Sequence, residues 1–482
     1  MSRRSWLFIL ILCCGTAVRL YGLGSESVWG DEAFAVQISK PPIGDVVNSA
    51  AGDIHPPLYF LSLHYWMAIA GSSEAGIRSL SALASIATLM AAFGVARLVL
   101  GDRVALVAMA LVAFSPIQIG FAQEARMYAL LALLSTLSMW AFAAFVAFVA
   151  ERRQQTFVLY VLSSAALLYL HVYGFWILAA QALTIVWLLT TKAPNAKVLA
   201  LTWMGGLGVV GLIWLPWSPI FLAQFDRVQS GFWIARPSWA GLFEVLVAYA
   251  GSTGLAACLA ALAFLGALAS IRVMPAMPLR LPILLPWLAA PILLPFALSQ
   301  MGSSIFLPKY TIAASIPLAI LAAAGLAALP WSLVRHAALV LVVGWTLANV
   351  HALRTNVHKD DWRTAVSRLE HEAQPGDLVV FYKYFNQIPF EFYRTRADLD
   401  VGPFSPDIYV LTPQPGILRY HLTHAVGDRN RAWLIMLRGE PLRDDLMATF
   451  GARFQRVKDT FVQNVELVLF EGSNLGYSPR VR

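Results

Sequence analysis

Long apolar segments separated by short polar turns are the feature that most constrains the fold of this 482-residue chain. Hydrophobic residues make up 59% of the sequence and charged residues only 13%, about half the charged fraction of an ordinary soluble domain. This composition excludes a disordered chain and argues against a soluble globular one. A membrane-spanning helix needs roughly 20 mainly apolar residues. Eleven such segments occur, near 5–23, 76–100, 103–120, 127–150, 156–170, 172–190, 197–217, 241–271, 281–299, 308–328 and 335–351.

Basic residues predict which turns face the cytoplasm, because Lys and Arg accumulate on that side of a membrane. The stretch 55–71 carries two histidines and would span only about 25 Å at ~1.5 Å per residue, so we interpret it as interfacial. The first segment has no convincing small-residue cleavage site and is predicted to be a retained helix. Basic residues near the turns then share one side with Arg3 and Arg4: Arg97, Arg103, Arg152, Arg153, Lys192, Lys197, Arg272, Arg280 and Arg335. The chain is predicted to begin in the cytoplasm and to end on the opposite side.

The distribution of charge divides the chain into two domains. Residues 1–350 hold 18 Lys and Arg against 11 Asp and Glu, whereas residues 351–482 hold 17 against 16. The first domain is predicted to be transmembrane, with a long external loop at 24–75 that contains interfacial helices. The second is predicted to be a small α/β domain, with helices at 361–373 and 441–450 and strands at 378–382, 432–437 and 462–471. The basic excess lies in the membrane part and reports topology, so nucleic-acid binding is excluded.

Polar and ionisable side chains gather in five of the predicted external turns. Convergence of several turns on one membrane face is how a site between helices is built, so these turns supply the candidate site residues. The candidates, in chain order, are Asp31 and Glu32, His55 and Tyr59, Glu124, Arg126 and Tyr128, His171 and Tyr173, and Lys309 and Tyr310.

Each candidate also has a purely structural interpretation. Adjacent acids such as Asp31 and Glu32 usually form a solvated loop pair. Glu124 and Arg126 could form an ion pair with each other at a helix end. His171 could be a hydrogen-bonded interfacial histidine. Lys309 could extend its amine to water from the end of a helix, as Arg19 and Arg78 are expected to do.

Metal-ligating residues form no strong pattern. His421 and His424 resemble a metal-binding pair only loosely. All three cysteines, Cys13, Cys14 and Cys258, fall inside apolar segments, so neither a disulfide framework nor a CxxC metal site is indicated. The sequence therefore shows no required cofactor, and a divalent metal has no support from it.

Four motifs together resemble one enzyme family: WGDEA at 29–33, HPPLY at 55–59, QEARMY at 123–128 and KDDWR at 359–363. They are similar to motifs of the bacterial membrane glycosyltransferases of the GT-C superfamily. The most similar branch is the protein-mannosyltransferase-like family 39, which includes the lipid A aminoarabinose and lipopolysaccharide galacturonic acid transferases. The resemblance extends over essentially the whole membrane region, with the motifs in the family's order and in the expected loops.

The resemblance implies a GT-C-type fold of about eleven transmembrane helices with a periplasmic α/β domain. It also implies an inverting transferase that moves one sugar from a polyprenyl-phosphate donor to a cell-envelope acceptor, either a glycolipid such as lipid A or lipopolysaccharide, or a protein. This reaction would take place at the periplasmic face of the inner membrane. Asp31 matches the family's first-loop catalytic acid, Glu32 its neighbour, and Glu124 the second-loop acid. Lys309 stands where relatives often have Arg, and lysine binds phosphate as a point charge instead of bidentately.

The residue types fit this chemistry. An acceptor hydroxyl is a poor nucleophile, so a carboxylate such as Asp31 can act as general base, typically worth 10²–10⁴-fold in rate. The departing lipid phosphate needs cations or hydrogen-bond donors, which Lys309, His55 and Arg126 provide. Because the donor sugar is already activated, no nucleotide is needed, and the sequence has no GxxxxGK[ST] motif.

A polyprenyl-linked sugar or lipid transporter is the alternative function for a chain with many spans and intramembrane polar residues. Transporters, however, place ionisable residues near the middle of the bilayer on broken helices, often in two related halves. Here the acids lie toward one face and the two halves of the sequence do not repeat, which favours the enzyme.

Overall fold

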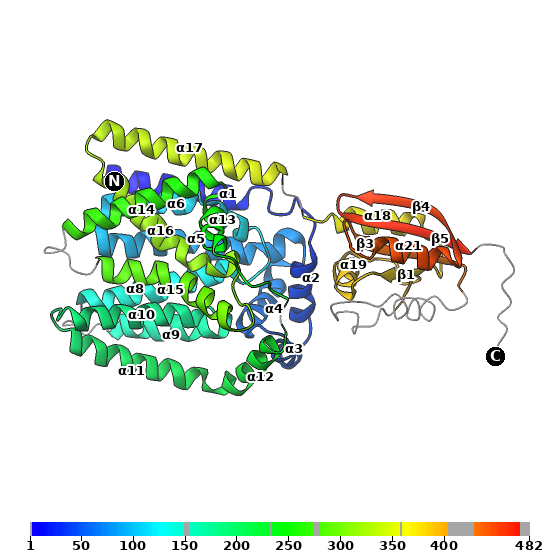
Figure 1. Cartoon of the computed structure of the whole chain (residues 1–482), viewed down its shortest axis with the longest axis horizontal. Coiled ribbons are helices and arrows are strands. Elements are labelled where there is room, and N and C mark those ends of the chain that lie inside the picture. Colours follow the sequence, from blue (N-terminus) through cyan, green and yellow to red (C-terminus); the bar gives the residue numbers. More distant parts are fainter. Residues whose placement is uncertain are drawn as a thin grey trace. The chain divides into compact units, whose positions relative to one another are not determined.

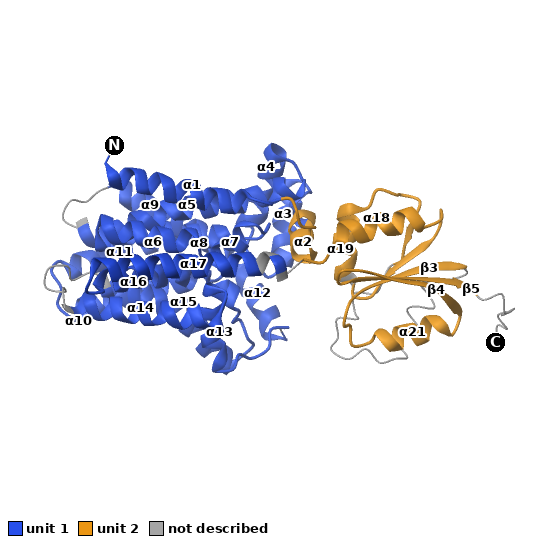
Figure 2. Cartoon of the chain, turned by 90° about the horizontal axis from the view of Figure 1, so that it is seen from above, with its two compact units in different colours: residues 1–23, 38–357 blue, residues 24–37, 358–482 orange. Residues whose placement is uncertain are grey.

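The computed structural model describes residues 2–148, 154–231, 233–272, 280–356, 359–402 and 429–472. The chain forms two compact units (Figure 2). The membrane unit consists of residues 1–23 and 38–357, and the C-terminal unit consists of residues 24–37 together with 358–482. Segment 24–37, part of the loop predicted to be external, therefore folds with the C-terminal unit. His421 and His424 lie outside the described residues.

The membrane unit is helical, with its longer helices running side by side (Figure 1). A helix occupies every one of the eleven predicted segments. Within the described residues, seven helical segments are long and apolar enough to cross a membrane, and the bent pair α6 and α7 adds an eighth. The helices are α1 (Arg3–Leu20), α3 (Ile43–Gly52), α4 (Leu58–Ala70), α5 (Glu74–Leu100), α6 (Asp102–Ala113), α7 (Pro116–Ala122), α8 (Tyr128–Phe148), α9 (Gln154–Leu170), α10 (Gly174–Thr190), α11 (Ala196–Trp214), α12 (Ser218–Gln229), α13 (Ala240–Ala250), α14 (Thr253–Arg272), α15 (Arg280–Met301), α16 (Ser315–Ala328) and α17 (Ser332–Asn356), with 3₁₀ turns η2 (Leu215–Trp217) and η3 (Pro308–Ala314).

Two predicted spans are broken, and the breaks have identifiable causes. The segment 103–120 forms α6 and α7, which meet at an angle of 57°. Pro116 is the first residue of α7, because proline lacks the N–H that a continuous helix would need there. The prediction of one helix over 241–271 is wrong. Gly251 adopts a left-handed conformation with φ +81°, which ends α13 before α14 begins.

Arg19 and Arg78 are buried inside the membrane unit, so the expectation that they extend to water is wrong. Arg19 donates hydrogen bonds to Ser85 Oγ (2.8 Å) and to the carbonyl oxygen of Ala113 (2.7 Å). Ala113 is the last residue of α6, where the helix itself leaves carbonyl groups without partners. Arg78 donates to the carbonyl oxygen of Leu23 at 3.1 Å. Both guanidinium groups therefore satisfy backbone groups at helix or loop ends.

The start of α1 lies beside the turn between α5 and α6. Asp102 accepts from Arg4 at 3.2 Å and from Arg97 at 2.7 Å. Gln123, in the turn between α7 and α8, instead donates to the carbonyl oxygens of Arg19 (3.0 Å) and Tyr21 (2.8 Å) at the other end of α1. The basic turn and the QEARMY turn therefore lie at opposite ends of this helix.

The C-terminal unit is a small α/β domain, as the sequence predicted. Its mixed sheet has the order β2-β1-β3-β5-β4, in which β1 is parallel to β2 and β3 while β5 is antiparallel to β3 and β4. Helices α18 and α19 cover one face and α21 covers the other (Figure 2). The elements are α2 (Gly30–Ser39), α18 (Trp362–Glu372), β1 (Leu378–Phe381), η4 (Tyr384–Asn386), α19 (Gln387–Tyr393), β2 (Asp400–Val401), β3 (Arg431–Leu437), α21 (Arg443–Gly451), β4 (Phe454–Val462) and β5 (Val465–Gly472).

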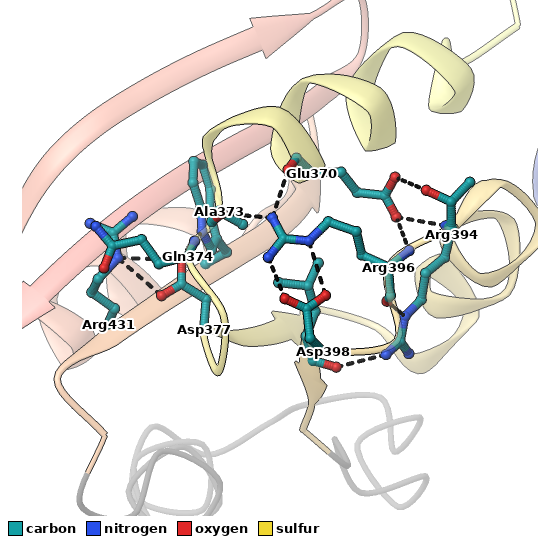
Figure 3. A network of polar contacts seen from close by, with 11 residues as sticks. Glu370, Ala373, Gln374, Asp377, Arg394, Arg396, Asp398 and Arg431 are labelled. Atoms are coloured by element: carbon teal, nitrogen blue, oxygen red, sulfur yellow. Dashed lines mark hydrogen bonds and ion pairs between the residues drawn. The ribbon is translucent and has the colours of Figure 1, made fainter.

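A polar network ties the end of α18 to the sheet (Figure 3). The buried Asp377 carboxylate accepts from the backbone N–H of Gln374 (3.0 Å), from Arg431 Nε (3.0 Å) and from Trp433 Nε1 (2.9 Å). Arg396 donates to the carbonyl oxygen of Ala373 at 2.6 Å. These bonds fix the turn between α18 and β1 against β3.

Candidate functional site

Four turns of the membrane unit, distant in sequence, bring predicted site residues together. One turn precedes α4, one precedes α8, one joins α9 to α10, and the last opens η3. We call the resulting group the histidine–tyrosine cluster, which consists of His55, Tyr128, His171, Tyr173, Lys309 and Tyr310.

His171 is the residue that joins these side chains. Its ring centroid lies 5.1 Å from that of Tyr310, 5.5 Å from Tyr173, 5.8 Å from His55 and 6.2 Å from Tyr128. All five of these residues are buried. The structure therefore brings these predicted site residues of the membrane unit together.

Lys309 lies against the aromatic rings of the cluster. Pro308 begins η3, and this places Lys309 in its first turn. The Lys309 Nζ atom lies 5.5 Å from the ring centroid of Tyr128 and 5.8 Å from that of Tyr310, within the range of cation–π attraction. The side chain thus contributes a half-buried positive charge to the cluster.

The imidazole of His171 is held as a neutral hydrogen-bond donor. Its Nδ1 atom accepts from the backbone N–H of Tyr173 at 3.1 Å, so in the neutral ring the proton resides on Nε2. Burial, followed by the positive charges of His55, Arg126 and Lys309, holds the pKa of His171 well below its ordinary value. The Nε2 atom is buried and has no hydrogen-bond partner in the described part of the chain. It can therefore donate to an acceptor atom of a ligand.

Asp53 is a member of the site that sequence reasoning missed. Its carboxylate pairs with His55 Nδ1 at 2.8 Å. Burial favours the protonated form of Asp53, but the hydrogen bond and charge of His55 oppose it, and the net pKa lies below the usual value. Gln224 on α12 donates to the carbonyl oxygens of Ala50 (2.9 Å) and Asp53 (3.1 Å), which fixes this part of the loop. In the sequence, the signal for this pair was that Asp53 lies two residues before His55.

Arg126 adds a further charge to the same region. The residue is buried, and its charge lowers the pKa of both Asp53 and His171. Its backbone N–H donates to the carbonyl oxygen of Glu124 at 2.8 Å, which closes the QEARMY turn. Tyr59, in α4, is also fully buried, and its ring contacts that of Phe60.

Asp31 and Glu32 belong to the C-terminal unit, in the first turn of α2. Carboxylates in a first helical turn are stabilised by the helix dipole. Glu32 is completely buried, and its Oε2 atom lies 3.1 Å from Lys359 Nζ. Asp31 is half-buried. The two adjacent acids therefore have different environments, and the solvated-pair interpretation does not describe Glu32.

Metal ligands are not grouped in the described part of the chain. Among these residues, no cluster of three or more His, Cys, Asp or Glu side chains is arranged to hold an ion.

Comparisons with known proteins agree with the predicted fold. Residues 54–219 match the family model described as dolichyl-phosphate-mannose-protein mannosyltransferase. The structure of ArnT from Cupriavidus metallidurans bound to undecaprenyl phosphate matches with a TM-score of 0.66 and 16% identity, over 99% of this chain and 100% of that chain. The archaeal oligosaccharyltransferase AglB from Archaeoglobus fulgidus, in complex with an inhibitory peptide and a dolichol-phosphate, matches with a TM-score of 0.62 and 10% identity. That match covers 99% of this chain and 75% of AglB.

No curated protein sequence matches the chain. The structural matches extend over nearly the whole chain, so the predicted fold is confirmed: a helical membrane region with a small C-terminal α/β domain, similar to the fold of ArnT.

Proposed function

We propose that this chain, a membrane glycosyltransferase of the GT-C type, transfers a sugar from a polyprenyl-phosphate-linked donor to a hydroxyl group of a cell-envelope acceptor. The family-model match and the shared fold support the enzyme class that the motifs predicted. The donor, the acceptor and the residue roles given below are our proposal. The acceptor class comprises lipid A or lipopolysaccharide, another glycolipid, or a protein.

The histidine–tyrosine cluster is the observation that carries the proposal. Positive charge from Lys309 and Arg126, together with the His171 Nε2–H donor, is gathered where the turns meet the ends of apolar helices. A lipid phosphate places its anionic head near this level while its chain remains in the bilayer. Fixed donors and cations stabilise the negative charge that develops on a leaving phosphate. ArnT, one of the matched proteins, was crystallised with such a lipid, which supports a lipid phosphate as the ligand.

The reaction proposed is a direct displacement. The acceptor oxygen attacks the anomeric carbon, the bond from that carbon to the phosphate oxygen breaks with its electron pair, and the acceptor proton moves to a carboxylate. Asp31 is the carboxylate that we assign as general base, because it matches the family's first-loop acid. A single displacement inverts the anomeric centre. The phosphate remains on the polyprenyl chain, where Lys309, Arg126 and His171 neutralise its charge.

The site is proposed to face the periplasm of a bacterial inner membrane, because the basic residues favour a cytoplasmic N-terminus. A reporter that is active only in the periplasm, fused after Arg482, should be active. Activity from a cytoplasm-only reporter at the same junction would contradict this orientation.

Mass spectrometry of cell-envelope glycolipids and glycoproteins from a deletion strain tests the function. We expect loss of one sugar residue from an acceptor, restored by the wild-type gene and not by one that encodes Asp31→Asn. The purified enzyme, assayed with a panel of undecaprenyl-phosphate sugars, should then release undecaprenyl phosphate only with the matching sugar and acceptor. An unchanged set of acceptors, with undecaprenyl-linked sugars redistributed across the membrane, would instead support a flippase and overturn the proposal.

A further inference from the structure

We propose that Lys359 is a positioning residue for the proposed reaction, and that the C-terminal unit serves to hold the Asp31-bearing turn of α2 in a fixed orientation. The inference rests on the proposed function, because it assigns Asp31 as the general base. It gives the C-terminal unit a role in catalysis through contacts that lie entirely within that unit.

The Lys359–Glu32 pair is the first contact that holds the turn. The Lys359 ammonium group lies 3.1 Å from Glu32 Oε2, and the Glu32 side chain is inaccessible to solvent. A buried carboxylate is costly unless it is paired and hydrogen-bonded. The ion pair with Lys359 therefore stabilises the observed position of the first turn of α2.

The orientation of Asp31 follows from that pair. Consecutive residues of an α-helix point about 100° apart, so Asp31 and Glu32 cannot share one face. With Glu32 directed into the interior of the unit, Asp31 lies toward the side of the helix and stays half-buried. The buried acid thus sets the direction of its neighbour.

The segment that leads into α2 is held at further points. The hydroxyl group of Tyr393 accepts from the backbone N–H of Val28 at 2.7 Å. Arg363 donates through its backbone N–H to Ser27 Oγ (3.1 Å) and through its guanidinium group to the carbonyl oxygens of Gly24 (3.3 Å) and Glu26 (3.2 Å). The first turn is thus approached by a segment that is itself fixed.

Gly30 allows α2 to pack closely on the rest of the C-terminal unit. A Cβ atom at this position would clash with the ring of Phe385, so only glycine allows this approach. The ring of Phe34, one turn later, lies 6.2 Å from the same Phe385 ring. The Phe385 contacts of Gly30 and Phe34 and the Lys359–Glu32 pair thus all hold α2 within the C-terminal unit.

Steady-state kinetics of Lys359→Met test the inference. We expect kcat to fall roughly 10-fold or more, while KM for the undecaprenyl-phosphate sugar stays unchanged, because a mispositioned base slows the chemical step without weakening donor binding. Lys359→Arg should restore part of kcat, since it keeps the positive charge. Lys458→Met, which removes a lysine paired with Glu372 at the surface of the same unit, is the matched control and should leave kcat unchanged.

A double variant covers the case in which Lys359→Met fails to fold because the buried Glu32 carboxylate has lost the neighbouring positive charge. The double variant, Glu32→Gln with Lys359→Met, removes both charges. Because the two residues form one pair, their effects should not add, and kcat of the double variant should be no lower than kcat of either single variant. Wild-type kcat in this double variant, or a Lys359→Met effect that appears only in KM, would overturn the inference. Asp31→Asn separates the two proposals: full activity in that variant refutes the proposed base, whereas an inactive Asp31→Asn beside a fully active Lys359→Met refutes only the positioning role.

Discussion

The Nδ1 atom of His171 accepts a hydrogen bond from the backbone N–H of Tyr173 at 3.1 Å. This bond determines which nitrogen of the ring carries the proton, and it leaves the buried Nε2–H group without a hydrogen-bond partner among the residues that the structure describes. A donor fixed in this way loses little freedom when it binds an anion, which is the condition for strong electrostatic stabilisation.

Replacement of His171 tests this role. His171→Ala removes a hydrogen bond to a charged group, and such bonds are worth about 1.5–3 kcal/mol, so we expect roughly 10-fold or greater loss of kcat/KM. His171→Gln should keep more activity than His171→Asn, because the longer amide places an N–H group near the position of Nε2. The measurement is steady-state kinetics with an undecaprenyl-phosphate sugar. Equal activity in all three variants would show that the ring only fills space.

The pH dependence of stability also reports on His171. Its folded-state pKa lies well below the ordinary value of 6.5, mainly because of burial, with further contributions from the charges of His55, Arg126 and Lys309. Below about pH 6.5 the unfolded chain therefore binds a proton that the folded chain does not, and stability falls as the pH decreases. Thermal unfolding of the purified protein between pH 8 and pH 5 should show a smaller loss for His171→Gln than for wild type. Parallel curves would contradict this prediction.

Lys309 is predicted to bind the lipid phosphate. Lys309→Ala should raise KM for the donor roughly 10-fold, because a charge opposite the phosphate is lost, whereas Lys309→Arg should retain part of the affinity. Lys197→Ala removes an exposed lysine at the start of α11 and is the matched control. If Lys309→Ala and Lys309→Arg both behave as wild type, the position is only an anchor, and Arg126 and His55 become the main phosphate ligands.

Most of the fold could be predicted from apolar run length, because a membrane span and a buried strand both leave a continuous hydrophobic signal. The breaks were harder to predict. Gly251 ends α13 and Pro116 begins α7 inside apolar runs, where local chemistry interrupts the segment without changing its hydrophobicity. Strand β4 left no signal, because most of its residues are exposed and do not alternate with buried ones.

The site was predictable as a set of residues but not as a set of contacts. The predicted external turns supplied His55, Lys309 and Tyr310 as candidates, and the structure places them in one cluster with His171. The pairing of Asp53 with His55 was not predicted, because an acid in a loop is ordinarily solvated and the two-residue spacing is only a weak signal. Nor could the sequence show that Arg19 is internal, since its partners at the end of α6 exist only because that helix breaks.

Asp31 is predicted to be the general base. Proton transfer requires a carboxylate, and Asp31→Asn keeps the size of the side chain while removing its basicity. We therefore expect kcat to fall roughly 10²-fold or more, without loss of membrane insertion. The assay uses purified protein and a panel of undecaprenyl-phosphate sugars, with folding checked by thermal stability.

The control for Asp31 is Asp45→Asn, which changes an exposed acid in the first turn of α3 and should leave the rate unchanged. Glu32→Gln should cost less than Asp31→Asn, because Glu32 is buried against Lys359 and is proposed to orient its neighbour without accepting the proton. If Asp31→Asn stays within a few-fold of wild type while Glu124→Gln is inactive, the base lies in the QEARMY turn. The first-loop acid would then have a role in holding the segment and not in the chemical step.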